Sequence, residues 1–165
     1  MVDLLTMAPF CNQRGLNVNH SDFMKTLGMV DIISECHKTL RKQTMEKIHA
    51  RFELRFSDTD TYLLSLIQHQ PISASDAARF MNVSRQAVHK QVKQLIALGL
   101  IKSSEENNNK RNKLLTLTTT GKEICTQITE IKAQFDAQLK QQLGLERYTL
   151  LAELLMDKAL LKIEK

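Results

Sequence analysis

The chain has 165 residues, of which 42% are hydrophobic and 25% are charged. This composition is typical of a folded protein of about one domain. Its five glycines and two prolines are too few for a β-rich chain with many tight turns. No apolar run approaches the roughly 20 residues that span a bilayer, and the first ten residues lack the pattern of a signal peptide. We therefore expect a cytoplasmic protein that does not interact with membranes.

The positive charge is concentrated in one part of the chain. Residues 71–121 hold eight lysines and arginines against three acidic residues, which accounts for the whole formal net charge of +5. Basic and acidic residues balance in 1–70 and again in 122–165. A neutral frame around one basic segment is typical of nucleic-acid-binding proteins, although a solvated basic surface gives the same count.

The sequence offers little for catalysis or for a bound cofactor. The three cysteines and five histidines are scattered singly, whereas zinc ligands come in close pairs. No phosphate-binding glycine loop, metalloprotease motif or nucleophile elbow is present. We therefore predict that the chain is not an enzyme and holds no cofactor and no metal ion.

Helical periodicity dominates the first seventy residues. Apolar positions three or four apart, from Met29 through Cys36 to Phe52, predict one long helix over about 22–51. Ser57 can cap a second helix, which ends before Pro71.

The segment 72–100 predicts two short helices joined by a tight corner. Ser73 or Ser75 can cap the first helix, whose predicted buried side is Ala77, Ala78, Phe80 and Met81. Asn82 tolerates the left-handed conformation of the corner, and Ser84 can cap the second helix. This second helix is predicted to bury Val88, Val92, Leu95 and Ile96 and to end at Gly99.

A helix-turn-helix places its second helix in the major groove of DNA. The candidate DNA-contacting residues of that helix are its cap and its free face: Ser84, Arg85, Gln86, His89, Lys90 and Lys93. Arg85 suits guanine and Gln86 suits adenine, while Lys93 suits a phosphate.

A basic hairpin follows the helix pair. Residues 100–103 and 113–117 read as strands on either side of the polar loop 105–112. Such a hairpin is a wing, and its candidate DNA contacts are Lys110, Arg111 and Lys113. Arginine inserts readily into a narrow minor groove.

The C-terminal part predicts two more helices. A regular apolar stripe from Ile124 to Leu143 indicates a helix over about 120–143, which Gly144 ends. The last predicted helix, about 146–163, is apolar on nearly all sides and therefore calls for a partner surface. We expect a homodimer built from the first helix and the last two.

Three stretches resemble the winged-helix core of the MarR family of regulators. They are ASDAARFMNVSRQAV, LIALGLI and NKRNKLLTLTTTG. The most specific piece is the wing followed by Leu117-Thr118-Thr119-Thr120-Gly121, with Arg111 at the position of the family's wing arginine. The chain departs from the family pattern at Ala77, Asn82 and Asn109, the last of which stands where an aspartate usually pairs with that arginine.

The resemblance implies a mainly α fold with a small β-hairpin wing, that is, a winged helix-turn-helix with N- and C-terminal dimerisation helices. The resemblance divides the chain into three parts. Residues 1–55 hold the N-terminal segment and the first dimerisation helix, 56–121 form the DNA-binding domain, and 122–165 form the C-terminal dimerisation helices. It also implies a sequence-specific transcriptional regulator, expected to be a repressor, that binds a pseudo-palindromic operator as a homodimer. The affinity of the regulator for double-stranded DNA is expected to change when a small, often aromatic, effector binds.

Other functions stay open at this point. Some relatives sense oxidants through a cysteine, and Cys11 is the candidate here because Cys36 falls on an apolar stripe and Cys125 adjoins another. Metal sensing through Glu35, His37 and His49 is a weaker alternative. A winged helix that binds a protein and has no operator is the third.

Overall fold

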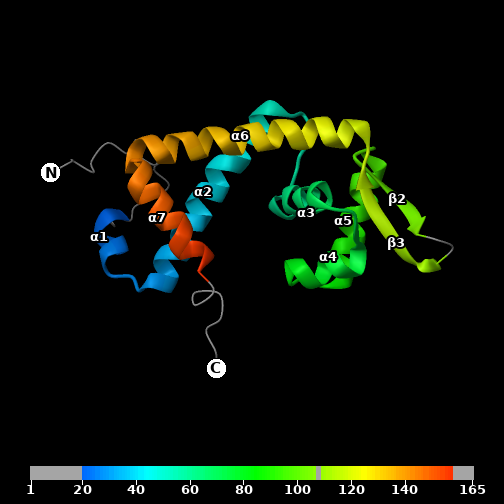
Figure 1. The fold of residues 1–165 in the computed structure, drawn as a ribbon, viewed down its shortest axis with the longest axis horizontal. Coiled ribbons are helices and arrows are strands. Elements are labelled where there is room, and N and C mark those ends of the chain that lie inside the picture. The colour runs from blue at the N-terminus through cyan, green and yellow to red at the C-terminus, as the bar shows by residue number, and fades with distance from the viewer. Residues whose placement is uncertain (1–19, 107–108, 158–165) are drawn as a thin grey trace, which may run out of the picture. The chain divides into compact units, whose positions relative to one another are not determined.

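The computed structural model describes residues 20–106 and 109–157, without the side chains of residues 105–112. The chain forms two compact units, Met1–Thr39 and Leu40–Lys165. Figure 1 shows the order of the elements along the chain. The second unit holds every described strand and the helices from α3 onward.

The N-terminal unit contains α1 (His20–Lys25) and the first half of α2 (Met29–Arg51). The prediction of one continuous helix over 22–51 is therefore wrong. The backbone turns at Thr26, whose amide and hydroxyl both donate to the Phe23 carbonyl at 3.0 and 2.7 Å. α2 starts after Gly28, whose carbonyl accepts from Ile32 N. The apolar positions that carry the predicted period all lie after this break, from Met29 onward, so their spacing said nothing about residues 22–28.

The second unit continues from the end of α2 through the remaining elements. They are α3 (Asp58–His69), β1 (Ile72–Ser73), α4 (Ala74–Met81), α5 (Arg85–Ala97), β2 (Ile101–Glu106), β3 (Asn109–Leu117), α6 (Thr119–Leu143) and α7 (Leu145–Met156). The predicted α3 begins at its expected cap: Ser57 accepts from Asp60 N at 3.1 Å, and Asp60 accepts from Ser57 N at 2.9 Å. This reciprocal capping box fixes where the helix starts.

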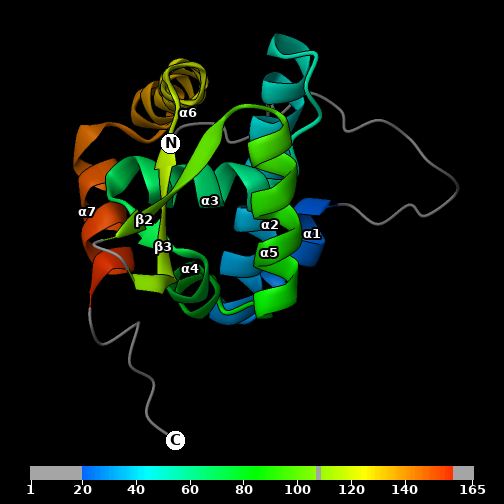
Figure 2. The same cartoon turned by 90° about the vertical axis from the view of Figure 1, so that its right-hand side faces the viewer.

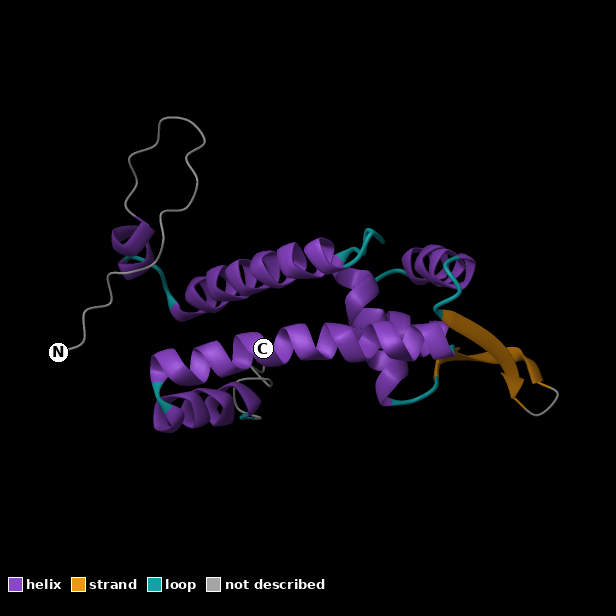
Figure 3. Cartoon of the chain, turned by 90° about the horizontal axis from the view of Figure 1, so that it is seen from above, coloured by secondary structure: helices purple, strands orange, loops and turns teal. Residues whose placement is uncertain are grey.

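The wing is the hairpin of β2 and β3, to which β1 adds a third strand in an antiparallel sheet of order β1-β3-β2 (Figure 3). β2 and β3 extend well into 105–112, so the predicted polar loop is much shorter than expected. The sequence did not predict β1, which pairs Ile72 with Leu115 and Ser73 with Leu114. A two-residue strand is too short to show any alternation. Its pairing holds the segment before α4 against the wing.

One hydrophobic core joins the end of α2, α3, α4, α5, the sheet and the first half of α6. Its fully buried members include Ile48, Leu63, Leu95, Leu100 and Leu115. On α4 and α5, the predicted burial of Ala77, Ala78, Val88, Val92 and Leu95 is confirmed.

Two positions predicted to be buried are exposed instead. The side chain of Phe80 is 65% exposed and that of Ile96 is 42% exposed. With about 100° per residue, Phe80 points well away from the side of α4 on which Ala77, Ala78 and Met81 lie. Ile96 stands at the edge of the buried side of α5.

α6 leads away from the base of the wing, and α7 folds back after Gly144 (Figure 1). Gly144 has φ of 79°, which ends α6 as predicted. The predicted last helix over about 146–163 is shorter in the structure: Asp157 is extended, and residues 158–165 lie outside the described part. α7 has no buried residue, and Leu150, Leu151, Leu154 and Leu155 are each 44–53% exposed. None of the described helices combines the length and the apolar character needed to cross a bilayer.

Candidate nucleic-acid interface

α4 is fixed at its start by a side-chain cap. Ser73, rather than Ser75, is the N-cap: its Oγ accepts from Asp76 N at 3.1 Å and donates to Asp76 Oδ2 at 2.7 Å. The hydrogen bond from Ser73, and then the one from Arg79, lower the pKa of Asp76. Asp76 therefore stays ionised near the positive end of α4, where a carboxylate is favoured.

The turn between α4 and α5 depends on Asn82. This residue has φ of 52° and ψ of 45° and is the only described non-glycine residue with positive φ. Val83 N donates to the Ala78 carbonyl at 3.1 Å, which closes the last turn of α4. Asparagine takes this left-handed conformation more easily than most residues. Asn82 thus supplies the left-handed residue that this turn requires.

Ser84 is the N-cap of α5, and its hydroxyl accepts from Ala87 N at 3.2 Å. The Ser84 hydroxyl therefore caps α5, as the sequence predicted. Gln91 Nε2 donates to Thr59 Oγ1 at the start of α3, and the buried residues Val88, Val92 and Leu95 fix the other side of α5. The orientation of α5 is thus set by its packing and by a side-chain contact that the sequence alone did not reveal.

The outward side of α5 gathers all five predicted side chains beyond the cap. They are Arg85, Gln86, His89, Lys90 and Lys93, and all are exposed. At 100° per residue they fall within one sector of about 140°, which adjoins the buried side of α5 because Val92 lies only about 20° from Arg85. The first turn of α5 has no acidic residue. None of these basic side chains forms an ion pair with another described residue. The basic side chains on this side of α5 thus have no acidic partner among the described residues, and the helix itself packs next to α4 (Figure 2).

The wing candidates lie on β3. Lys113 is exposed and stands opposite Glu105 in the β2–β3 register. The backbones of Lys110 and Arg111 are in the strand near its start, and Asn109 pairs with Glu106. The side chains of Lys110 and Arg111 lie outside the described part of the chain. The structure therefore places these residues on the hairpin without locating their charges.

Two of the three cysteines can be placed. Cys36, on the predicted apolar stripe of the first helix, is exposed in the protomer instead of buried. Cys125 is buried, as predicted, and burial raises its pKa to about 11. Its thiol stays protonated at neutral pH and is a poor nucleophile. Cys11, the candidate oxidant sensor, lies outside the described residues.

The candidate metal ligands do not come together. Glu35 pairs with Lys38, and His49 Nε2 lies 2.7 Å from the Phe56 carbonyl oxygen. No group of three or more His, Cys, Asp or Glu side chains within the described ranges could hold a metal ion.

Comparison with known proteins places this site in a family. The model of the MarR family matches residues 56–111, which contain α3, β1, the helix-turn-helix and most of the wing. The chain carries a MarR-family winged helix-turn-helix domain. This family consists of transcriptional regulators, in agreement with the prediction that the chain is not an enzyme.

Individual MarR-family proteins resemble the chain in sequence or in fold. The transcriptional regulator AdcR of Streptococcus pneumoniae is 30% identical over 63 residues, which span 38% of this chain and 43% of AdcR. A mutant of MarR from Escherichia coli matches with a TM-score of 0.68 and 21% identity, over 82% of this chain and 98% of MarR. A mutant of MepR from Staphylococcus aureus matches with a TM-score of 0.66 and 17% identity, over 82% of this chain and 100% of MepR. MarR is also described as the multiple antibiotic resistance repressor. These structural matches confirm a mainly helical MarR-like fold with a small β wing.

Proposed function

We propose that this protein is a DNA-binding transcriptional regulator that inserts α5 into the major groove. The observation that carries the proposal is the exposed side of α5, on which Gln86 stands among Arg85, His89, Lys90 and Lys93, none of which forms an ion pair with a described residue. Phosphates attract such a surface, and the major groove offers base edges that arginine and glutamine can read. The MarR-family match over this segment supports the same function.

Within this proposal the residues have separate roles. Arg85 and Gln86, in the first turn of α5, contact base edges, while His89 and Lys90 contact bases or phosphates. Ser84 positions the first turn, and Lys93 contacts the phosphate backbone. Lys110, Arg111 and Lys113 contact the flanking DNA from the wing. Residues 56–121 then form the DNA-binding domain, flanked by dimerisation segments in 1–55 and 122–165.

The acting species is a homodimer. The leucines of α7 leave an apolar surface that a single protomer does not cover, and a second copy of the chain would bury it. A two-fold dimer presents its two α5 helices to major grooves about 34–36 Å apart, so the operator is pseudo-palindromic.

The regulator acts as a repressor whose DNA affinity falls when a small effector binds. The repressor description of MarR supports the direction of control. An effector changes DNA affinity only if it binds the DNA-competent and the DNA-incompetent conformations with different affinities.

The test is titration of the purified protein onto DNA from upstream of its own gene, followed by fluorescence anisotropy with excess random competitor. We expect binding that survives the competitor and weakens steeply between about 50 mM and 200 mM salt, because phosphate contacts release counterions. Failure to bind at low salt would instead indicate a winged helix that recognises a protein.

Oxidant sensing through Cys11 is a separate proposal with its own test. Peroxide should abolish DNA binding by the wild type and spare the Cys11→Ser variant. A wild type that keeps its DNA affinity in peroxide would remove the proposal.

A further inference from the structure

A side-chain hydrogen bond joins the middle of α5 to the start of α3. Gln91 Nε2 donates to Thr59 Oγ1, which lies 32 positions earlier in the chain. The backbones of α3 and α5 approach each other at few points, because α5 packs mainly against α4 and β2. Apolar packing has no preferred direction, whereas a hydrogen bond weakens steeply when its angle changes. This bond therefore restricts how α5 can rotate or slide relative to α3.

The Thr59 hydroxyl belongs to a chain of hydrogen bonds with a fixed direction. Ser57 Oγ donates its single hydrogen to Asp60 Oδ2, and Asp60 is only 3% exposed. The Thr59 hydroxyl lies 3.1 Å from Ser57 Oγ and must therefore donate its own hydrogen to Ser57. Thr59 Oγ1 is left to accept, and the amide nitrogen of Gln91 supplies the donor. Because each bond in such a chain polarises the next, α5 is linked firmly to the capping box of α3.

The stability of the fold alone does not explain the presence of Gln91. Its amide oxygen, Oε1, is buried and has no hydrogen-bond partner among the described residues. An unsatisfied buried oxygen costs at least as much free energy as one ordinary hydrogen bond contributes. The net effect of the Gln91 amide on stability is therefore small. What the amide does supply is a directed contact with Thr59.

A second contact fixes the start of α3 to α2. Arg41 Nε donates to Asp58 Oδ2 at 2.8 Å, and Arg41 Nη2 donates to the Asp58 carbonyl oxygen at 3.1 Å. The same Nη2 also pairs with Asp58 Oδ1. A planar guanidinium that holds both the side chain and the backbone of one residue fixes its orientation. Since Asp58 directly precedes Thr59, α2, the start of α3 and α5 form one connected series.

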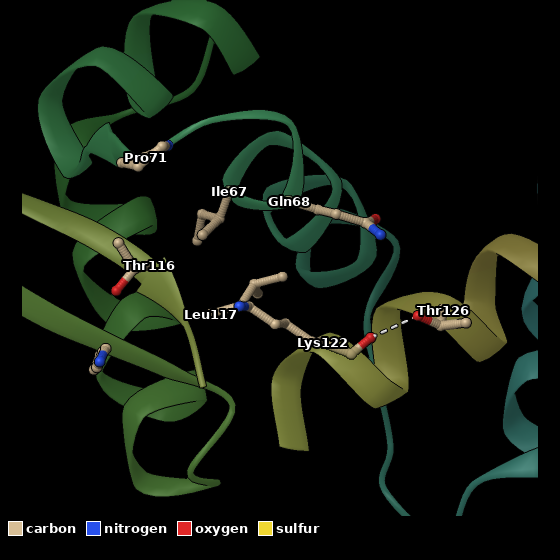
Figure 4. Close-up of a pocket in the computed structure, with 8 residues that line it drawn as sticks. Ile67, Gln68, Pro71, Thr116, Leu117, Lys122 and Thr126 are labelled. Atoms are coloured by element: carbon tan, nitrogen blue, oxygen red, sulfur yellow. Dashed lines mark hydrogen bonds between the residues drawn. The ribbon is translucent and has the colours of Figure 1, made fainter. Parts of the chain in front are cut away.

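This series is distinct from the pocket at the other end of α3. Ile67 and Gln68 line that pocket in the last turns of the helix, as Figure 4 shows. At 1.5 Å per residue, Thr59 lies about 12 Å along the helix axis from Ile67. The contacts of Thr59 are therefore not part of the pocket wall.

We propose that Gln91 and Thr59 are positioning residues for α5, and that Arg41 ties their contact to α2. They touch no base. They hold the exposed side of α5 in the orientation that fits the major groove, at a fixed place relative to the dimerisation segment. The inference rests on the proposed function, because the orientation of α5 affects recognition only if α5 enters DNA.

The first test compares the affinity of the full chain for its operator and for random-sequence DNA, measured by anisotropy. Thr59→Val removes the hydroxyl at nearly constant volume and should weaken operator binding about fivefold, the loss expected when one ordinary hydrogen bond no longer favours the competent orientation. Binding to random-sequence DNA should not change, because it depends on charges that all remain. Thr59→Ser keeps a hydroxyl and should bind the operator as the wild type does.

Gln91→Met tests the other side of the bond. It should also weaken operator binding about fivefold, while the free energy of unfolding stays nearly unchanged because the lost bond and the removed buried oxygen offset each other. Gln94→Met makes the same change at an exposed glutamine of α5 and should have no effect on affinity. The double variant Thr59→Val/Gln91→Met should lose no more affinity than either single variant, because both remove the same bond.

Arg41→Met tests the link to α2. It should weaken operator binding clearly more than Arg55→Met, which removes the same charge from an exposed arginine that forms no ion pair with a described residue. Equal effects of these two variants would overturn the role of Arg41. The role of the Gln91–Thr59 bond is overturned if Thr59→Val and Gln91→Met bind the operator as the wild type does, if Thr59→Ser fails to restore affinity, or if operator and random DNA are weakened equally.

The orientation of α5 is also measured without DNA, from residual dipolar couplings of the backbone amides of α3 and α5. Thr59→Val should change the orientation of α5 relative to α3, and Thr59→Ser should keep it. A protein that shows this change and never binds DNA would refute the proposed function and retain the positioning contact. A protein that binds its operator, and whose Thr59→Val variant keeps both orientation and affinity, would retain the function and refute the positioning role.

Discussion

The backbone of Gly121 lies directly against the carbonyl group of Leu100: a β-carbon at Gly121 would stand 1.9 Å from the Leu100 oxygen and 2.9 Å from its carbon. Two hydrogen bonds explain the close approach. Thr118 N donates to that same oxygen at 3.0 Å, and Thr118 Oγ1 accepts from Gly121 N at 3.0 Å. The Thr-x-x-Gly sequence thus joins the end of β3 and the start of α6 to the corner between α5 and β2.

Gly121→Ala should therefore destabilise the protein by about 2–3 kcal/mol, because the new methyl group meets rigid backbone atoms. Thr120→Ala is the matched control: it gives alanine at the neighbouring exposed position of the same helix. The measurement is chemical denaturation of both variants. Equal stability of the two variants would contradict the close approach.

The sequence predicted the elements whose signals are local. Ser57, Ser73 and Ser84 cap the helices as expected, and Asn82 and Gly99 adopt positive φ. Each of these residues acts on backbone groups within a few positions of itself. The sequence did not predict β1 or the Gln91–Thr59 contact, because both depend on segments far apart in the chain. The predicted burial of Phe80 was wrong for a related reason. Apolar character alone does not say which side of a short helix faces the core.

Replacement of the first outward residue of α5 should impair DNA binding. We expect Arg85→Ala to cost about 1–3 kcal/mol of binding free energy and to relax base preference within the half-site. Gln86→Ala should do the same at a different base pair, because the two side chains leave α5 about 100° apart. Lys140→Ala, near the far end of α6, is the control. Anisotropy with operators mutated at single base pairs measures both effects, and wild-type behaviour of the two α5 variants would show that DNA binds elsewhere.

The wing should contribute to DNA affinity and less than α5 to base preference. Arg111→Ala and Lys113→Ala should weaken binding to all operators nearly equally and flatten the salt dependence, because wing contacts mainly concern the backbone and the minor groove. The readout is the slope of log affinity against log salt for each variant. A wing variant that changes base preference as much as Arg85→Ala would contradict this division of roles.

Burial of Cys125 should make stability depend on pH in the alkaline range. Its pKa rises from 9.0 to about 11 on folding, so between these values the unfolded chain loses a proton that the folded chain keeps. Stability should therefore fall with rising pH across this window, by up to about 1.4 kcal/mol per pH unit. Below pH 9 the effect is absent.

Cys125→Ala isolates this contribution. The half-buried Lys132 has a lowered pKa, caused first by burial and then by Arg41. Its titration therefore makes the stability rise with pH, opposite to the effect of Cys125. Lys132 is present in both proteins, and its effect largely cancels in their difference. The difference in unfolding free energy between wild type and Cys125→Ala should shrink from pH 9 to 11. A difference that stays constant over this range would mean that Cys125 titrates normally in the folded protein.

The leucines of α7 should hold the dimer together. Leu151 and Leu154 lie on the same side of the helix and are about half exposed in the protomer. A double change to glutamate places two charges in the proposed interface, where they would have to lose their hydration. We expect a folded monomer in analytical ultracentrifugation, with loss of tight operator binding because each half-site then binds alone. Thr149→Glu adds a charge on the opposite side of α7 and should leave the dimer intact. If the Leu151/Leu154 variant still sediments as a dimer, another surface joins the two copies.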